Sequence, residues 1–136
     1  MRVLIDTNVI IDVLTRRHPL YGNSAAVLRM CGDQWTGLIT ASQTTDIFYL
    51  LRREKKSAAE AKAIIQKLVD NLTVADVTVA DVKNALVSEM DDYEDALLAF
   101  CGKRRKADYI ITRNDRDFKN SPIKAVTPEW LISSRP

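Results

Sequence analysis

Short apolar runs alternate with longer amphipathic segments along this chain, and the alternation limits the possible folds more than any other feature. The first run, RVLI (2–5), contains β-branched residues and ends at Asp6, as a buried parallel strand does. Four more strand-like runs follow: WTGLIT (35–40), LTVADVT (72–78), ADYIITRN (107–114) and IKAVT (123–127). Helical periodicity is expected over residues 8–14, 23–31, 42–53, 57–71, 79–88, 92–105 and 128–133.

Strands that are separated by helices pair in parallel, because the crossover brings the chain back to the same edge of the sheet. We therefore expect an α/β fold, with a three-layer α/β/α sandwich around a mainly parallel sheet of four to five strands. A length of 136 residues is typical of one domain, so residues 1–136 are expected to form a single domain.

The composition narrows the kinds of chemistry that this chain can perform. Hydrophobic residues make up 46% and charged residues 28%, an ordinary globular mixture without a run long enough to span a membrane. Acidic and amide residues interrupt the N-terminal segment, which argues against a signal peptide. Cys31 and Cys101 fall in apolar helical stretches and are expected to be core residues of a cytoplasmic protein. With His18 as the single histidine, any chemistry must depend on carboxylates.

The net charge of +2 does not by itself indicate nucleic-acid binding, but the basic residues are clustered in a way that suggests a path for binding phosphates. Basic residues cluster at 16–17, at 52–56, at 103–106 and again through 113–124. Solvated helix faces explain each cluster separately. If several clusters lie on one rim, they form an electrostatic track for phosphates. The candidates for RNA contact are Arg113 and Arg116 beside the site, with Arg52 and Arg53 farther out.

Polar side chains follow two of the predicted strands, and others open the helices that begin at the same edge of the sheet. Asp6 comes directly after the first strand, and Thr112 and Asn114 follow a later one. Asp46 lies early in the helix after the second strand, and Asp95 lies at the start of the helix DDYEDALLAF (91–100). Ligands bind at the carboxyl ends of parallel strands, so we expect these side chains to converge.

Clustered carboxylates repel one another unless a cation neutralises them. Mg²⁺ and Mn²⁺ prefer oxygen ligands, and Mg²⁺ typically keeps waters while it contacts one or two carboxylates and a substrate phosphate. Waters on such an ion are nucleophiles for phosphodiester hydrolysis. The convergence therefore predicts a metal-dependent phosphodiesterase.

Each acidic residue also has a simpler structural explanation. Asp6 is suited to cap the helix that starts at Thr7, and Asp46 and Asp95 are suited to the positive N-terminal ends of helices. Further acidic residues outside the three main positions are interpreted as solvated, capping or turn residues, namely Asp12, Asp92, Asp115 and Asp117.

Three motifs together resemble the PIN domain, the compact nuclease fold of VapC-type toxins: LIDTNVIIDVL, DYEDALLAF and ADYIITRNDRDF. The resemblance covers the chain from its first strand to the terminal TPEWLI. It implies an Mg²⁺- or Mn²⁺-dependent endoribonuclease that acts on RNA as the toxin of a toxin–antitoxin pair. A cognate antitoxin and a homodimer are also implied.

The resemblance assigns roles to residues of this chain. Asp6 is the first acidic residue, with Asn8 orienting it, and Asp95 is the third. Asp46 stands where the family usually has a longer Glu. Asn114 aligns with the variable last acid, with two carboxylates close by, and Thr112 is the hydroxyl expected near the scissile phosphate. The proposed metal ligands are thus Asp6, Asp46, Asp95 and Asp115, with Asp117 as a further catalytic candidate.

Two other readings compete with the nuclease. A phosphoacceptor receiver domain is also a small parallel α/β fold, but it needs a carboxylate pair after the first strand, where this chain has Asp6 alone. A PIN-like RNA-binding or scaffold module without catalysis fits the two departures from the family pattern, Asp46 and Asn114.

Overall fold

The computed structural model describes residues 1–134, and its centre is a sheet of parallel strands. The strands are β1 (Arg2–Ile5), β2 (Thr36–Thr40), β3 (Thr73–Ala75), β4 (Tyr109–Ile111) and β5 (Ala125–Val126). They form a 5-stranded sheet in the order β3-β2-β1-β4-β5, and every neighbouring pair is parallel. The predicted fold class is confirmed, with β1 in the middle of the sheet.

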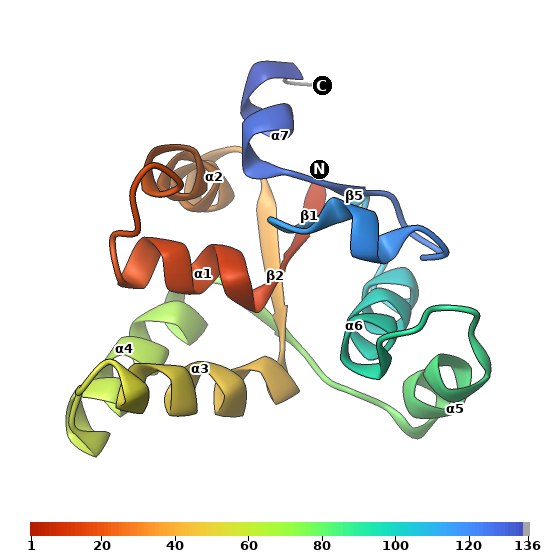
Figure 1. Cartoon of the computed structure of the whole chain (residues 1–136), viewed down its shortest axis with the longest axis horizontal. Coiled ribbons are helices and arrows are strands. Elements are labelled where there is room, and N and C mark those ends of the chain that lie inside the picture. Colours follow the sequence, from red (N-terminus) through yellow and green to blue (C-terminus); the bar gives the residue numbers. More distant parts are fainter. Residues whose placement is uncertain (135–136) are drawn as a thin grey trace.

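Helices connect the strands as the sequence pattern predicts (Figure 1). They are α1 (Thr7–Leu14), α2 (Tyr21–Asp33), α3 (Ala41–Arg53), α4 (Ala58–Asn71), α5 (Val79–Val87), α6 (Tyr93–Arg104) and α7 (Pro128–Ser134), with a short 3-10 helix, η1 (Asp115–Phe118). The helix expected over 23–31 is longer at both ends, and Gly32 lies inside it. The strand expected over 107–114 is shorter, because the chain after Ile111 turns away from the sheet.

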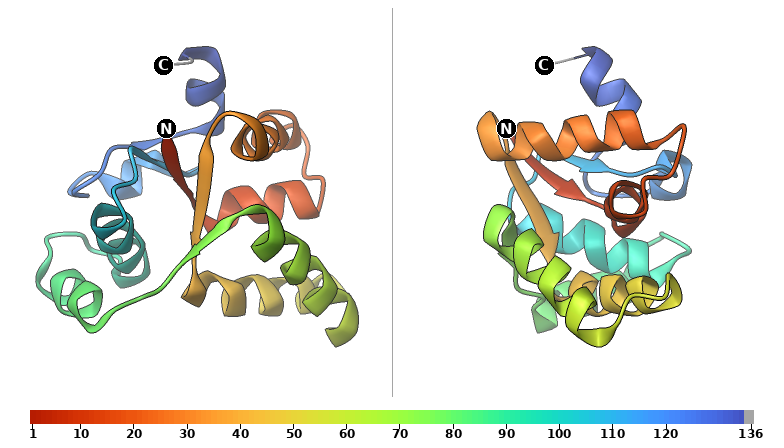
Figure 2. Two further views of the ribbon diagram at one scale, coloured as in Figure 1. Left: turned by 180° about the vertical axis from the view of Figure 1, so that it is seen from behind. Right: turned by 90° about the vertical axis from the view of Figure 1, so that its left-hand side faces the viewer.

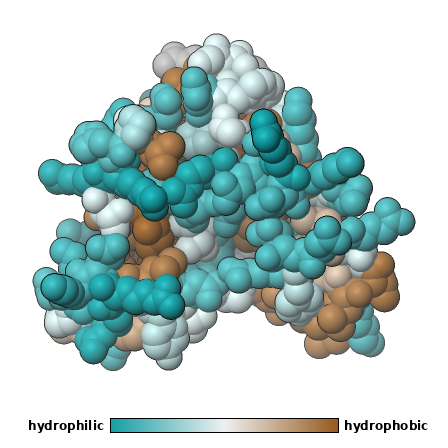
Figure 3. Space-filling view, viewed as in Figure 1, coloured by the Kyte–Doolittle hydropathy of each residue, from teal (hydrophilic) through white to brown (hydrophobic). Residues whose placement is uncertain are grey.

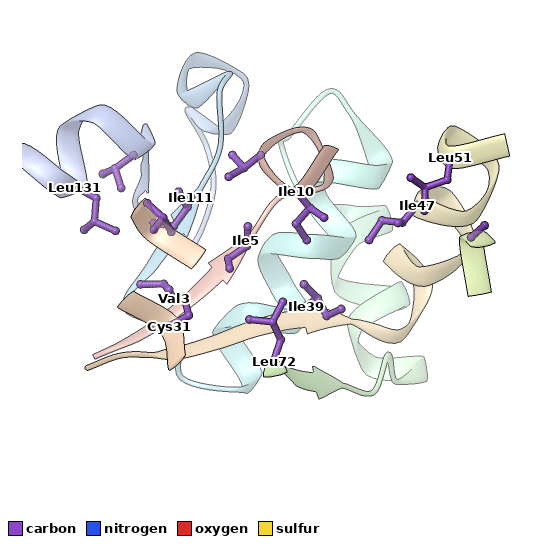
Figure 4. Packing of buried hydrophobic residues seen from close by; sticks show 14 residues of the cluster. Val3, Ile5, Ile10, Cys31, Ile39, Ile47, Leu51, Leu72, Ile111 and Leu131 are labelled. Atoms are coloured by element: carbon purple, nitrogen blue, oxygen red, sulfur yellow. The ribbon is translucent and has the colours of Figure 1, made fainter. Parts of the chain in front are cut away.

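The sheet has one apolar cluster on each face, which makes the fold a three-layer sandwich. Val3 and Ile5 pack with buried residues of α1, α2, α3 and α7, as Figure 4 shows, while Leu4 packs on the opposite face against α5 and α6. The left view of Figure 2 shows the same division, with α5 and α6 on one side of the strands and α1 and α2 on the other. Alternate residues of β1 therefore fill two separate cores.

Capping interactions fix the helix starts at the edge where the strands end. Thr40 and Gln43 form a capping box at α3, and the Gln43 amide also donates to the carbonyl oxygen of Ile5 over 2.8 Å. Ser57 and Glu60 form a second capping box at the start of α4. Because Gln43 joins the start of α3 to the end of β1, it holds two elements of the candidate site together.

The surface carries an apolar patch, and both cysteines lie in the interior. Figure 3 shows a largely hydrophilic face with an apolar patch at lower right, where α5 exposes Val79, Leu86 and Val87. Both cysteines are free and buried, as expected, and burial raises the pKa of the Cys31 thiol to about 12. Within residues 1–134, no helix has the length and apolar character needed to cross a membrane.

Candidate active site

Asp6 occupies the point where β1 ends and α1 begins. One carboxylate oxygen, Oδ1, accepts a hydrogen bond from the Thr7 backbone N–H over 2.7 Å, so Asp6 does cap α1. The other oxygen, Oδ2, accepts from Thr112 Oγ1 over 2.8 Å. The capping role and the site role are therefore compatible, because each uses a different oxygen.

Thr112 links the loop after β4 to the start of α1. Its side chain is buried, and its hydroxyl accepts from the Asn114 backbone N–H (3.1 Å) and the Asn8 amide (3.4 Å) while it donates to Asp6. Asn8 Oδ1 in turn accepts from the Arg113 backbone N–H over 3.2 Å. This network holds the loop after β4 against the start of α1, and Asn8 is connected to Asp6 only through the Thr112 hydroxyl.

Two adjacent cavities, of about 290 and 480 Å³, share Asp6, Thr7, Glu94 and Asp95. Asp46 lines the first cavity, while Asn8, Asn114 and Asp117 line the second. We call this combined space the acidic cleft and define it by five of its carboxylates, Asp6, Asp46, Glu94, Asp95 and Asp117; Glu54 and Asp92 also line the second cavity. The structure thus gathers carboxylates from α1, α3, α6 and η1 around one opening.

The charges in the acidic cleft are mutually unfavourable. Burial, followed by the negative charges of Asp92, Asp6, Asp117 and Glu94, raises the pKa of Asp95 to about 7. Burial also raises the pKa of Asp6, although hydrogen bonds from Thr112 and Thr7 oppose it. The pKa of Glu94 is raised by burial and then by the charges of Asp46, Asp92 and Asp6. Such a cluster attracts cations.

Sequence reasoning missed Glu94 as a site residue. Glu94 lines both cavities, next to Asp95 in the first turn of α6. The signal was its place in that turn, where successive acidic residues surround the same helix end. Asp92 also lines the second cavity, and it caps α6 by accepting the Asp95 backbone N–H over 2.9 Å, as its capping interpretation predicted.

The structure separates the two acidic candidates of η1. Both side chains are exposed, but Asp117 lines the acidic cleft, whereas Asp115 lines neither of its two cavities. A 3-10 helix has three residues per turn, so side chains two positions apart point in directions about 120° apart around its axis. Asp115 is thus not brought together with the other predicted metal ligands, while Asn114 is beside them.

The arginines that were predicted to contact RNA also differ in whether they lie beside the acidic cleft. Arg113 lines the acidic cleft, and Arg116 lines a neighbouring cavity with Asp117 and Lys119. Arg52 and Arg53 lie in the last turn of α3 and line neither part of the acidic cleft, although the next residue, Glu54, lines its second cavity. Arg17, which was not selected from the sequence, lines the cleft.

Asp12 departs from its predicted surroundings. The interpretation of Asp12 as a solvated or capping residue is wrong, because it is only 1% exposed. One of its oxygens lies 3.5 Å from Nη1 of Arg113. The side chain follows Val9 by three residues, so α1 buries both on one face.

The donor chemistry of the acidic cleft fits a hard divalent cation. Every side chain that defines it offers carboxylate oxygens, the ligands that Mg²⁺ and Mn²⁺ prefer. Among residues 1–134, however, no three His, Cys, Asp or Glu side chains are close enough to hold an ion together as they stand. In proteins, Mg²⁺ commonly takes one or two carboxylates and completes its shell with water.

Comparisons with known proteins agree with this geometry. Residues 2–116 match the family model described as PIN domain. A curated relative, ribonuclease VapC1 of Aquifex aeolicus (strain VF5), is 28% identical over 134 residues, which cover 94% of this chain and 91% of that protein.

Two solved structures share the fold at low sequence identity. VapBC2 from Rickettsia felis, crystallised with a DNA fragment from its promoter, has a TM-score of 0.73 at 16% identity and covers 93% of this chain and 98% of that chain. A toxin–antitoxin complex from Klebsiella pneumoniae has a TM-score of 0.70 at 19% identity, with 93% and 97% covered. With the family model spanning most of its length, this chain belongs to the PIN domain family.

Proposed function

We propose that this protein is an endoribonuclease that hydrolyses RNA phosphodiester bonds with a divalent cation, Mg²⁺ or Mn²⁺, bound in the acidic cleft. The observation that carries the proposal is the gathering of carboxylates around Asp6 and Asp95, with the pKa of Asp95 raised to about 7. A cation would neutralise this repulsion. The similarity to a protein named as a ribonuclease supports RNA as the substrate.

The cation would be held mainly by Asp6 and Asp95, with Asp46, Glu94 and Asp117 contacting it directly or through water. When bound, Mg²⁺ or Mn²⁺ polarises a phosphate oxygen and lowers the pKa of its water. Asp46 is one methylene shorter than the Glu usual in the family, so we expect its contact to pass through water. Asp115 is left out of this ligand set, because it lines neither cavity of the acidic cleft.

The chain's own residues have separate tasks around that cation. Thr112 and the Thr7 backbone N–H orient the Asp6 carboxylate and favour its ionised form. Asn8 and Thr112 fix the loop that carries Arg113 and Asn114. Arg113, Arg116 and Arg17 surround the acidic residues, where their positive charge binds the phosphates and stabilises charge on the phosphoryl oxygens.

The test is cleavage of RNA by the purified protein with Mn²⁺, and again after EDTA. We expect cleavage only with the metal, and a loss of several orders of magnitude in Asp6→Asn. This variant keeps the shape of the side chain and removes the charge. Cleavage that continues unchanged in EDTA, or in Asp6→Asn purified in the same way, refutes the proposal.

A non-catalytic RNA-binding module is the second candidate function. Asp46 in place of Glu, and Asn114 in place of an acid, both favour it. This module would bind RNA in the presence of Mn²⁺ and leave it uncut, whereas the nuclease would turn it over.

The toxin role is also part of the proposal. The K. pneumoniae structure is of a toxin–antitoxin complex, and we infer that a small cytoplasmic antitoxin covers the acidic cleft of this protein with a basic side chain. A bidentate Arg is the best mimic of the cation there. Expression should arrest growth, and coexpression of a short neighbouring reading frame should relieve it. If expression is harmless and no such reading frame is present, the protein is a stand-alone nuclease.

The homodimer remains a prediction, which analytical ultracentrifugation of the purified protein tests.

A further inference from the structure

Asp12 is a buried carboxylate with an incomplete set of partners. Its Oδ1 accepts no hydrogen bond from the described residues, and the nearest cation, Nη1 of Arg113, is 3.5 Å away. Burial raises the pKa of Asp12, while the charges of Arg113 and Arg17 act in the opposite direction. A buried carboxylate in this state costs stability, so its contribution to folding does not explain it.

A second buried ion pair of this protein shows what a stabilising arrangement looks like. Asp81 accepts from Nε and Nη2 of Arg104 at 3.0 Å each, and from the Thr78 backbone N–H. Although burial would raise the pKa of Asp81, these hydrogen bonds lower it below its usual value. The Asp81–Arg104 pair therefore joins α5 to α6 with its oxygens satisfied, in contrast to Asp12 and Arg113.

Arg113 is the residue on which Asp12 acts. The Arg113 backbone N–H donates to Asn8, and Arg113 lines both the acidic cleft and a cavity of about 370 Å³ that Asp12 lines with α2 and α7. A guanidinium beside clustered carboxylates is attracted towards them, where it would take the place of a divalent cation. Asp12 provides a counter-charge on the other side of Arg113, outside the acidic cleft.

We propose that Asp12 is a positioning residue that holds the Arg113 guanidinium at the rim of the acidic cleft, out of the cation's place and available to a substrate phosphate. The inference rests on the proposed function, and it assigns Asp12 a role in both RNA and cation binding. The Asp12 contact at Nη1 leaves other guanidinium N–H groups free for phosphate oxygens.

A double-mutant cycle with Asp12→Asn, Arg113→Gln and the double variant tests the proposal. RNA binding is measured in EDTA over a range of salt concentrations, and Mn²⁺ binding by electron paramagnetic resonance. We expect Asp12→Asn to weaken RNA binding by roughly 10–150-fold, as for a lost charge-assisted contact. Its salt slope should flatten by up to about 0.7, the value for one phosphate contact to a single strand.

Mn²⁺ binding should weaken in Asp12→Asn as well, because the released guanidinium competes for the carboxylates. Both effects should disappear when Arg113 is already Gln. Asp81→Asn is the matched control, since it removes a buried Arg-paired carboxylate elsewhere and should lower the melting temperature without changing either affinity. Arg113→Lys does not change α1, but lysine lacks the planar guanidinium that binds a phosphate through two N–H groups. This variant should therefore weaken RNA binding as Asp12→Asn does.

Additive effects of the two substitutions, or a change in stability alone, overturn the positioning role. The mobility of the Arg113 Nε–H group in ¹⁵N relaxation gives a readout that needs no RNA. We expect it to increase in Asp12→Asn, and an unchanged signal together with unchanged Mn²⁺ affinity overturns the inference. If the native protein binds no RNA while the Mn²⁺ and relaxation results appear as expected, the proposed function fails and the positioning of Arg113 stands.

Discussion

Thr112 Oγ1 donates a hydrogen bond to Asp6 Oδ2 over 2.8 Å, across 106 positions of the sequence. The hydroxyl is fully buried, and the same oxygen accepts from the loop that carries Asn114. One side chain therefore sets the direction of the first acidic residue and the shape of the loop after β4.

Replacing Thr112 by Val keeps the shape and removes both functions of the hydroxyl. We expect the free energy of unfolding to fall by about 1–3 kcal/mol, because the partners of a buried hydroxyl become unsatisfied. RNA cleavage should fall about 10–100-fold through misorientation of Asp6. Thr112→Ser restores the hydroxyl and should recover most of the activity. Denaturant unfolding and kcat/KM for the three proteins check this, and a Val variant with normal cleavage contradicts the orienting role.

The pH dependence of stability reports on Asp95. Its pKa is about 7 in the folded protein, above the ordinary value of 3.8, chiefly because of burial and the charge of Asp92. Between these two pH values the folded state binds more protons than the unfolded state, so stability falls as pH rises through this window.

Asp95→Asn should therefore be more stable than the native protein at neutral pH, with a flatter profile between pH 4 and 7 in EDTA. Adding Mn²⁺ should stabilise the native protein and leave Asp95→Asn nearly unchanged, because a ligand of the folded state raises its stability. Thermal melts across this range give the measurement. Identical profiles for the two proteins contradict the assignment.

Much of this arrangement is predictable because parallel strands place their ends at one edge. The rule correctly brings Asp6, Thr112 and the start of α6 together, since it needs only the order of strands and helices. The cap positions of Ser57 and Asp92 are local and were equally predictable.

The remaining features depend on contacts that the pattern does not specify. The choice between Asp115 and Asp117 depends on the 3-10 geometry of η1, and a turn prediction does not say which side chain faces inward. Burial of Asp12 follows from packing against Arg113 and α7, although its spacing from Val9 was a readable sign. Glu94 was passed over for its neighbour, because a helix start alone does not show that two adjacent acids line one opening.

The basic residues around the acidic cleft should differ in their contribution to RNA affinity. Arg116 lines a cavity next to Asp117, so Arg116→Ala should weaken binding to unrelated RNA sequences alike and flatten the salt slope by about 0.7. Lys103→Ala at the far end of α6 is the control and should change little, as should Arg53→Ala. Filter binding at several salt concentrations measures both quantities. An equal loss of RNA affinity in all three variants indicates that RNA responds to the overall positive charge and that no particular row of basic residues binds it.

The length of the side chain at position 46 should control cation affinity. Asp46→Glu adds the methylene that the family usually has, so we expect tighter Mn²⁺ binding, and Asp46→Asn should weaken it. Glu94→Gln, which removes a neighbouring charge from the same cavity, should also weaken Mn²⁺ binding. Mn²⁺ titrations of the three variants rank these carboxylates. Unchanged affinity in both Asp46 variants places that side chain outside the cation's reach.

An aromatic side chain is exposed at the edge of the acidic cleft. Tyr93 lines the cavity that contains Asp46, and its residue is 45% exposed. Aromatic rings that stack on unpaired bases contribute about 1–3 kcal/mol per base without sequence preference. Tyr93→Ala should therefore weaken single-stranded RNA binding about 5–100-fold. Stacking involves no phosphate, so the salt slope should stay the same.

Tyr93→Phe retains the ring and should bind RNA as the native protein does. Tyr49→Ala is the matched control, because Tyr49 is 67% exposed on α3 and lines neither part of the acidic cleft. The native protein and Tyr93→Ala should bind with equal affinity to an RNA that lacks the stacked base at one abasic position. If Tyr93→Phe is as weak as Tyr93→Ala, the hydroxyl and not the ring contacts the RNA, and stacking is refuted.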